Sequence, residues 1–147
     1  MDDDDTILIY GNILDEEDIK RPGESFTPQE IEIIRDVNQK VAAVNSIDRI
    51  LDFIFERMGS HLSCDRIGLA FIQDNGLRLV SQYMVSNYDN IHLGNGYSQD
   101  LLGSSLETVL KSGKPRIINS LDRYFSHHPD SQSTRLILKE GIHSSMT

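Results

Sequence analysis

The chain has 147 residues, which is enough for one domain with a single hydrophobic core. Its formal net charge of −9 is uneven, because residues 1–24 hold nine acidic and two basic side chains and so carry −7 of the total. Acidic side chains repel phosphate backbones, so we expect no direct nucleic-acid binding. No apolar run approaches the roughly 18 residues of a membrane span. The N-terminus is acidic where a secretory signal is basic, and Cys64 is the only cysteine, so we expect a cytoplasmic protein.

Residues 1–26 form an acidic leader in which only residues 6–10 are β-prone. This short run could pair with a sheet edge, and its sequence is equally compatible with no docking at all. A helix begins after the leader, because Thr27 and Glu30 form a capping box and Pro28 occupies the first helical position.

Apolar residues then recur with the alternating spacing of a heptad repeat, interrupted at Asp48. Asn45 and Ser46 look like the end of one helix and the cap of the next, which predicts helices over 28–44 and 46–61. The second has a wide apolar face suited to packing on a sheet. The first has a narrow stripe suited to a partner helix, which predicts a homodimer through the seam Ile34, Val37, Val41 and Val44. The alternative is that both helices pack only within their own chain.

A β-hairpin is predicted over 66–72 and 77–85, because the sequence Asp74-Asn75-Gly76 between them is typical of a tight turn. Residues 86–103 read as a long irregular segment with a weak strand at 91–93. Ser104 and Glu107 form a second capping box, Gly113 ends that helix, and 116–118 reads as a strand. A further irregular segment covers 121–130. A helix then runs from a cap at Asp130 or Ser131 to residue 139, and a strand begins at residue 142.

This order of elements over residues 46–147 resembles the GAF family of small-molecule sensor domains. The more specific part of the resemblance is the run GSSLETVLKSGKP from Gly103 to Pro115, together with EGIHSS from Glu140 to Ser145. The resemblance implies an α+β fold with a GAF/PAS-like central antiparallel sheet flanked by helices. A GAF domain continues with another strand and a helix, which are missing after Thr147. We expect the strand edge left open to be covered by a second chain or by residues 6–10.

The resemblance also implies a ligand pocket between one face of the sheet and the irregular segments. Mapped onto this chain, its candidate residues are Phe71, Tyr83, Tyr97, Arg116, Leu121, Tyr124, Phe125 and His143. Catalytic members of the family use several cysteines, so Cys64 alone argues against an enzyme. Adjacent His127 and His128 cannot converge on one ion in regular structure, so we expect no metal and no other cofactor.

The sequence therefore predicts an acidic leader over 1–26, a dimerising or signalling helix over 27–45, and a GAF-like domain over 46–147 that lacks its C-terminal end. The predicted function is that of a non-enzymatic bacterial sensory or regulatory domain. It would bind an unidentified small molecule, dimerise, or both, and control an attached kinase, cyclase, phosphodiesterase or activator. The alternative is a dimerisation module without a small ligand.

Overall fold

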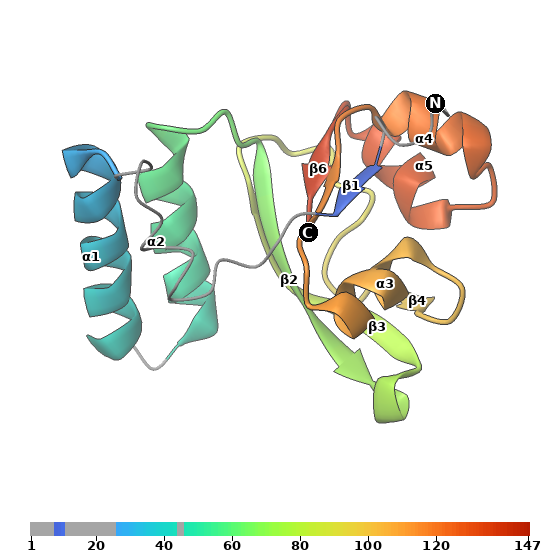
Figure 1. Cartoon of the computed structure of the whole chain (residues 1–147), viewed down its shortest axis with the longest axis horizontal. Coiled ribbons are helices and arrows are strands. Elements are labelled where there is room, and N and C mark those ends of the chain that lie inside the picture. Colours follow the sequence, from blue (N-terminus) through green and yellow to red (C-terminus); the bar gives the residue numbers. More distant parts are fainter. Residues whose placement is uncertain (1–7, 11–25, 44–45) are drawn as a thin grey trace. The chain divides into compact units, whose positions relative to one another are not determined.

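The computed structural model describes residues 26–43 and 46–147 and the backbone of residues 8–10. Its helices are α1 (Pro28–Ala43), α2 (Ile47–Gly59), α3 (Ser105–Ser112), α4 (Leu121–His127) and α5 (Gln132–Lys139), with a short 3-10 turn, η2 (Asp74–Gly76). Its strands are β1 (Leu8–Tyr10), β2 (Arg66–Gln73), β3 (Arg78–Ser86), β4 (Ser98–Asp100), β5 (Arg116–Ile118) and β6 (Ser145–Met146) (Figure 1). The α+β class predicted from the sequence is confirmed.

The strands described here form two three-stranded sheets, with the orders β1-β5-β6 and β2-β3-β4. The sequence predicted one central sheet, so this division corrects it. The described residues fall into two compact parts. Residues 8–10, 72–80 and 90–147 form one, which we call the C-terminal part. Residues 26–43, 46–71 and 81–89 form the other, which we call the helical part.

In the helical part, α1 and α2 lie side by side, joined through residues 44–45 (Figure 1). The predicted capping box starts α1: Glu30 Oε2 accepts the Thr27 backbone N–H at 2.7 Å, and the Glu30 N–H donates to Thr27 Oγ1 at 3.3 Å. The half-buried residues of α1 are Ile33, Asp36, Val37 and Lys40, which recur at the i, i+3, i+4 and i+7 spacing of one helix face. Lys40 lies over the Phe53 ring of α2, at 5.4 Å from the centroid.

The C-terminal part has its core on β5 and α4. Ile118, Leu121 and Tyr124 are buried together, and Ile137, Leu138 and Ile142 pack against them. β5 is the middle strand of its sheet, because β1 pairs antiparallel with one edge and β6 with the other. Residues 8–10 of the leader therefore do pair with a sheet edge. They pair with β5. The prediction from sequence was that these residues or a second chain would cover the open edge of the last strand.

Two local predictions in the C-terminal part are wrong. Residues 91–93 are not a strand: the Glu140 carboxylate accepts the backbone N–H groups of His92 and Leu93, at 2.7 and 2.6 Å. The strand lies instead at β4, where Gln99 pairs with Leu79 of β3.

Residues 121–127 are the helix α4, although the sequence suggested an irregular segment. Ser120 caps this helix by accepting the Arg123 N–H at 3.3 Å. Leu121 and Tyr124, three residues apart, then face the core from one side of it.

Candidate functional site

The predicted polar contact Arg116 lies at the centre of a hydrogen-bonded cluster in the C-terminal part. From β5, Arg116 Nη1 donates to Ser105 Oγ at 2.6 Å and Nη2 donates to Thr147 Oγ1 at 2.8 Å. Ser105 is the first residue of α3, and its Oγ also lies 2.9 Å from the Tyr124 hydroxyl. The cluster ties together β5, α3, α4 and the residue after β6. A guanidinium held among hydroxyl groups is suited to an anionic or strongly hydrogen-bonding ligand.

Two predicted wall residues, Leu121 and Tyr124, lie in the core next to this cluster rather than facing open space. Their exposed fractions are 3% and 7%. The Tyr124 ring stacks on the His128 ring, with the centroids 4.3 Å apart and the planes 17° apart. The side chains of the chain itself therefore occupy much of the space that the resemblance gives to a ligand.

The remaining predicted residues of the C-terminal part sit around this core. His143 Nδ1 lies 2.8 Å from Asp122 Oδ2 at the surface, and the His143 carbonyl accepts the Leu121 N–H at 2.8 Å. Phe125 is half-buried, with the Arg135 guanidinium 5.7 Å from its ring centroid. Burial raises the pKa of the half-buried Tyr97, and a hydrogen bond with Ser133 opposes that rise.

The last two predicted wall residues, Phe71 and Tyr83, belong to the helical part and are exposed. The structure therefore brings Arg116, Leu121, Tyr124 and His143 into one neighbourhood, through Ser105 and the start of α4. Sequence reasoning did not single out Ser105. Its signal was its position directly after the predicted cap Ser104.

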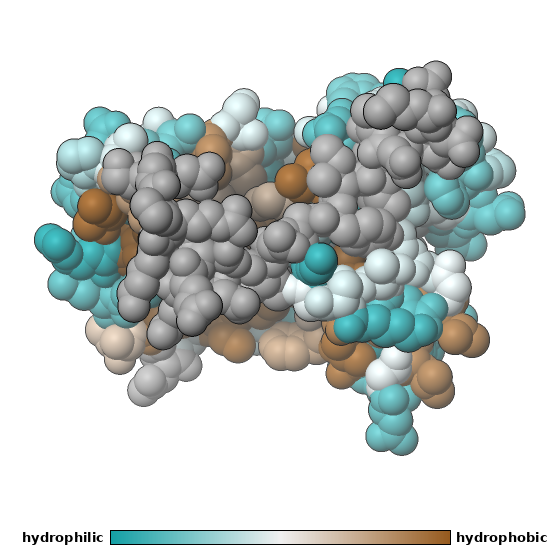
Figure 2. All heavy atoms as spheres, in the orientation of Figure 1, coloured by the Kyte–Doolittle hydropathy of each residue, from teal (hydrophilic) through white to brown (hydrophobic). Residues whose placement is uncertain are grey.

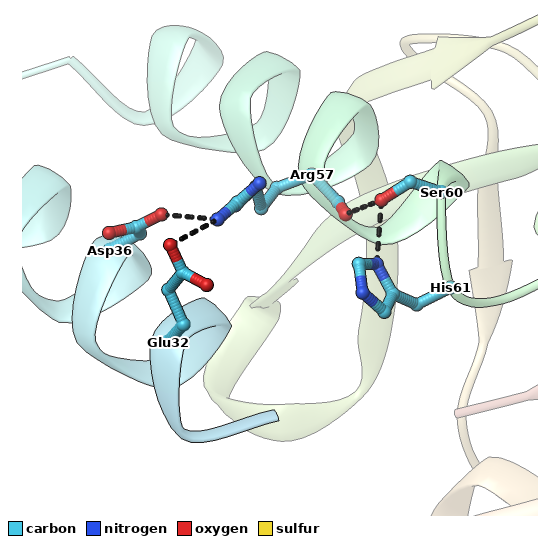
Figure 3. Close-up of polar contacts among 5 residues, drawn as sticks. All are labelled: Glu32, Asp36, Arg57, Ser60 and His61. Carbon is cyan, nitrogen blue, oxygen red and sulfur yellow. Dashed lines mark hydrogen bonds and ion pairs between the residues drawn. The ribbon is translucent and has the colours of Figure 1, made fainter. Parts of the chain in front are cut away.

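An open groove of about 480 Å³ lies in the helical part, lined by Asp36, Phe53, Glu56, Arg57 and Ser60. Figure 3 shows Arg57 reaching from α2 to two carboxylates of α1. Arg57 Nη2 lies 2.7 Å from Asp36 Oδ2 and 3.8 Å from Glu32 Oε1. At the other end of the groove, Ser60 Oγ donates to the Arg57 carbonyl at 3.0 Å and lies 2.6 Å from His61 Nδ1.

Arg57 fixes α1 against α2 in this groove. Its side chain is one-third exposed, and its Nε is buried with no hydrogen-bond partner among the residues that the structure describes. The Asp36 carboxylate is therefore the main negative charge that offsets the desolvation cost of the partly buried Arg57 guanidinium. A second hollow of about 330 Å³ lies beside the end of α2, lined by Phe55, Glu56, Gly59, Leu62, Ser63, Cys64, Asp65 and Asn87. Neither concavity is lined by a predicted ligand residue.

The other candidate surface is α1 itself, where apolar side chains face solvent. Ile31, Ile34 and Val41 are 46%, 44% and 49% exposed. Figure 2 shows apolar residues at the surface over α1. Of the predicted seam, Ile34 and Val41 are exposed, Val37 is half-buried, and Val44 lies outside the described residues. Large apolar groups that cluster on a surface mark an interaction site more often than scattered ones do.

Two features were searched for in the described part of the chain, a metal site and a membrane-spanning helix. It contains no group of three or more His, Cys, Asp or Glu side chains that could hold a metal ion. No helix within it is long and apolar enough to cross a membrane.

Comparison of the chain with protein-family models, with curated proteins and with solved structures finds no match. The resemblance to GAF domains therefore rests on the element order and the two sequence motifs alone.

Proposed function

We propose that this chain is a non-enzymatic sensory or regulatory domain of the GAF type, in a cytoplasmic signalling protein, that acts as a homodimer through α1. One observation carries the proposal: α1 presents the apolar side chains of Ile31, Ile34 and Val41 to solvent, while a different face of the same helix packs on α2. A helix that packs on one face and exposes clustered apolar side chains on another can bind a second partner, and the first partner, α2, is already present within the chain. The second partner is a helix of another subunit.

The cluster around Arg116 supports the sensory half of the proposal. A small molecule with an anionic or hydrogen-bonding group would compete for the guanidinium and for the hydroxyl groups of Ser105 and Thr147. Because these groups come from α3, β5 and the residue after β6, exchange of their partners would change how those elements are held together. An attached output domain would respond to that change, to the extent that the ligand binds the two states with different affinity.

Sedimentation of the full chain over a concentration series tests the dimer. We expect a monomer–dimer equilibrium in the wild type and a monomer for Ile34→Asp, which places a charge in the apolar stripe. Gln39→Asp is the matched control, because Gln39 is exposed on α1, away from the exposed apolar side chains and from the face that packs on α2, and should leave the dimer intact. A monomeric wild type would end the proposal of a dimeric function.

The second candidate function is an interaction module with no small ligand. It is favoured by the burial of Leu121 and Tyr124, which fill the core beside the Arg116 cluster. Native mass spectrometry of the purified protein separates the two candidates. Excess mass that is lost on denaturation supports the sensor. A dimer of twice the chain mass and no more, unaffected by the addition of small anions such as phosphate or acetate, supports the interaction module.

A further inference from the structure

The exposed stripe of α1 has the spacing of a coiled-coil seam, and it includes one polar residue. Ile31, Ile34, Asn38 and Val41 are all exposed, and they follow one another at intervals of three, four and three residues. That is the order a, d, a, d of a heptad repeat, with Asn38 at an a position. The stripe is shifted from the seam predicted by sequence, because Val37 belongs to the half-buried face that includes Asp36 and Lys40.

We infer that α1 binds α1 of a second copy of this chain as a parallel, in-register pair, with Asn38 facing Asn38 of that copy. This inference rests on the proposed dimeric function and adds the face, the orientation and the register. An Asn at a single a position stabilises the arrangement in which it meets another polar group, at some cost in affinity. An apolar partner helix would leave the amide of Asn38 buried without a hydrogen bond, whereas an identical copy in register supplies one.

Charge on the flanks of the stripe agrees with the same arrangement. In this heptad frame Glu30 is a g position and Arg35 is the following e position. A parallel pair brings each g position beside the e position five residues later on the other helix. Glu30 of each copy therefore lies beside Arg35 of the other, and the symmetry of the dimer makes this contact twice.

Cysteine cross-linking tests the face and the register in the full chain. The background is Cys64→Ser, which keeps a donor for the Arg66 carbonyl that Cys64 Sγ contacts at 3.2 Å. We expect Ile34→Cys to form an intermolecular disulfide under mild oxidation. We expect Val37→Cys to fail, because cysteines whose Cα atoms are more than about 7 Å apart cannot be bridged without backbone movement. Efficient cross-linking at residue 37 would overturn the shifted stripe.

Mixed cross-linking tests the orientation. When Ile31→Cys and Val41→Cys proteins are mixed and oxidised, a parallel pair gives 31–31 and 41–41 disulfides, which mass spectrometry separates from 31–41 products. Predominant 31–41 products would overturn the inference while leaving a dimeric function intact. A wild type that sediments as a monomer would instead overturn the dimeric function itself. Circular dichroism of each variant shows whether it has folded.

Two further variants test the polar contacts. Asn38→Val should tighten the dimer by about fivefold or more, since it removes a buried amide, and should also allow out-of-register or larger assemblies. Arg35→Glu should weaken the dimer by about fivefold, because both flanking contacts become repulsive. An unchanged dissociation constant for both variants would place these residues outside the interface and overturn the inference.

Discussion

Glu30 of α1 and Glu107 of α3 each lie in the first turn of a helix and accept a hydrogen bond from a backbone N–H just before that helix. Hydrogen bonds from Thr27, its backbone N–H first, lower the pKa of Glu30. The pKa of Glu107 is lowered by its bond with Lys111 and then by the Gly103 backbone N–H, which donates to Glu107 at 2.8 Å. Each ionised carboxylate therefore favours the folded state. The capping box at Thr27 and Glu30 is as the sequence predicted. The box predicted at Ser104 and Glu107 is wrong, because Ser104 Oγ donates to the Leu101 carbonyl and Glu107 accepts the Gly103 N–H rather than that of Ser104.

The lowered pKa of Glu107 predicts acid sensitivity. A carboxylate whose pKa is lower folded than unfolded stabilises the protein above its unfolded value, near 4.5, and loses this contribution as the pH falls through the folded value. Glu107→Gln should therefore lose less unfolding free energy than the wild type between pH 6 and pH 3, as measured by urea denaturation. Lys111→Gln keeps the Gly103 bond and should be intermediate. Equal losses in all three proteins would contradict this role of Glu107.

A second residue-scale prediction concerns Asp36 and Arg57. Their contact of 2.7 Å joins two side chains that are each about one-third exposed, so solvent screens it in part. A double-mutant cycle with Asp36→Asn and Arg57→Met should give a coupling energy of about 0.5–1 kcal/mol in the free energy of unfolding.

Glu32 provides the matched comparison for that cycle. It lies 3.8 Å from the same guanidinium and is 67% exposed, so Glu32→Gln should cost less than Asp36→Asn. The reverse order would mean that Glu32, and not Asp36, holds α1 against α2. The sequence could not reveal this contact, because no local pattern says which residues of two neighbouring helices face each other.

At the scale of elements, substitutions at two glycines measure the cost of backbone conformation separately from the cost of packing. Gly141, which follows the C-cap residue Glu140 of α5, has φ of 85°, and Gly59 is the last residue of α2. A Cβ added at either position meets nothing within 4 Å. Gly141→Ala should therefore cost about 1 kcal/mol through backbone strain alone, whereas Gly59→Ala should be neutral or stabilising by up to about 1 kcal/mol. Thermal unfolding followed by circular dichroism measures both. A neutral Gly141→Ala would contradict the left-handed conformation.

Helices with strong caps were predictable and elements defined by distant partners were not. Thr27 and Pro28 mark the start of α1, and Gly113, with φ of 65°, marks the end of α3. The position of β4 depends on its pairing with β3, about 20 residues earlier in the chain. With seven residues, α4 is too short to show a helical period, and only its burial against Ile118 reveals it.

At the scale of the whole molecule, the sequence predicted the α+β class but not the division of the strands. Strand pairing is a long-range property, and β5 obtains one neighbour from each end of the chain. The predicted ligand residues divide in the same way, because Phe71 and Tyr83 fall in the helical part and Arg116, Leu121 and Tyr124 in the C-terminal part. The order of elements along the chain does not say which strands pair, and the pairing decides which residues become neighbours.

The negative charge of the chain has a consequence for the proposed dimer. Dimerisation brings together two copies of a chain whose net charge is −9, and Asp15, Glu16, Glu17 and Asp18 contribute four negative charges in each copy. Their repulsion opposes dimerisation and is screened by salt, because the Debye length falls from about 10 Å at 0.1 M to about 3 Å at 1 M. The wild-type dimer should therefore tighten as salt rises, by about threefold between 0.05 and 0.5 M.

Neutralising those four acids, as Asn or Gln, isolates this effect. Sedimentation should show that the neutralised variant forms a tighter dimer than the wild type at 0.05 M salt and an equally tight one at 0.5 M. The quantity to compare is the ratio of the dissociation constants of the two proteins, because the attraction between Glu30 and Arg35 weakens with salt in both. A salt-independent ratio would therefore argue that repulsion between these acids does not oppose the dimer.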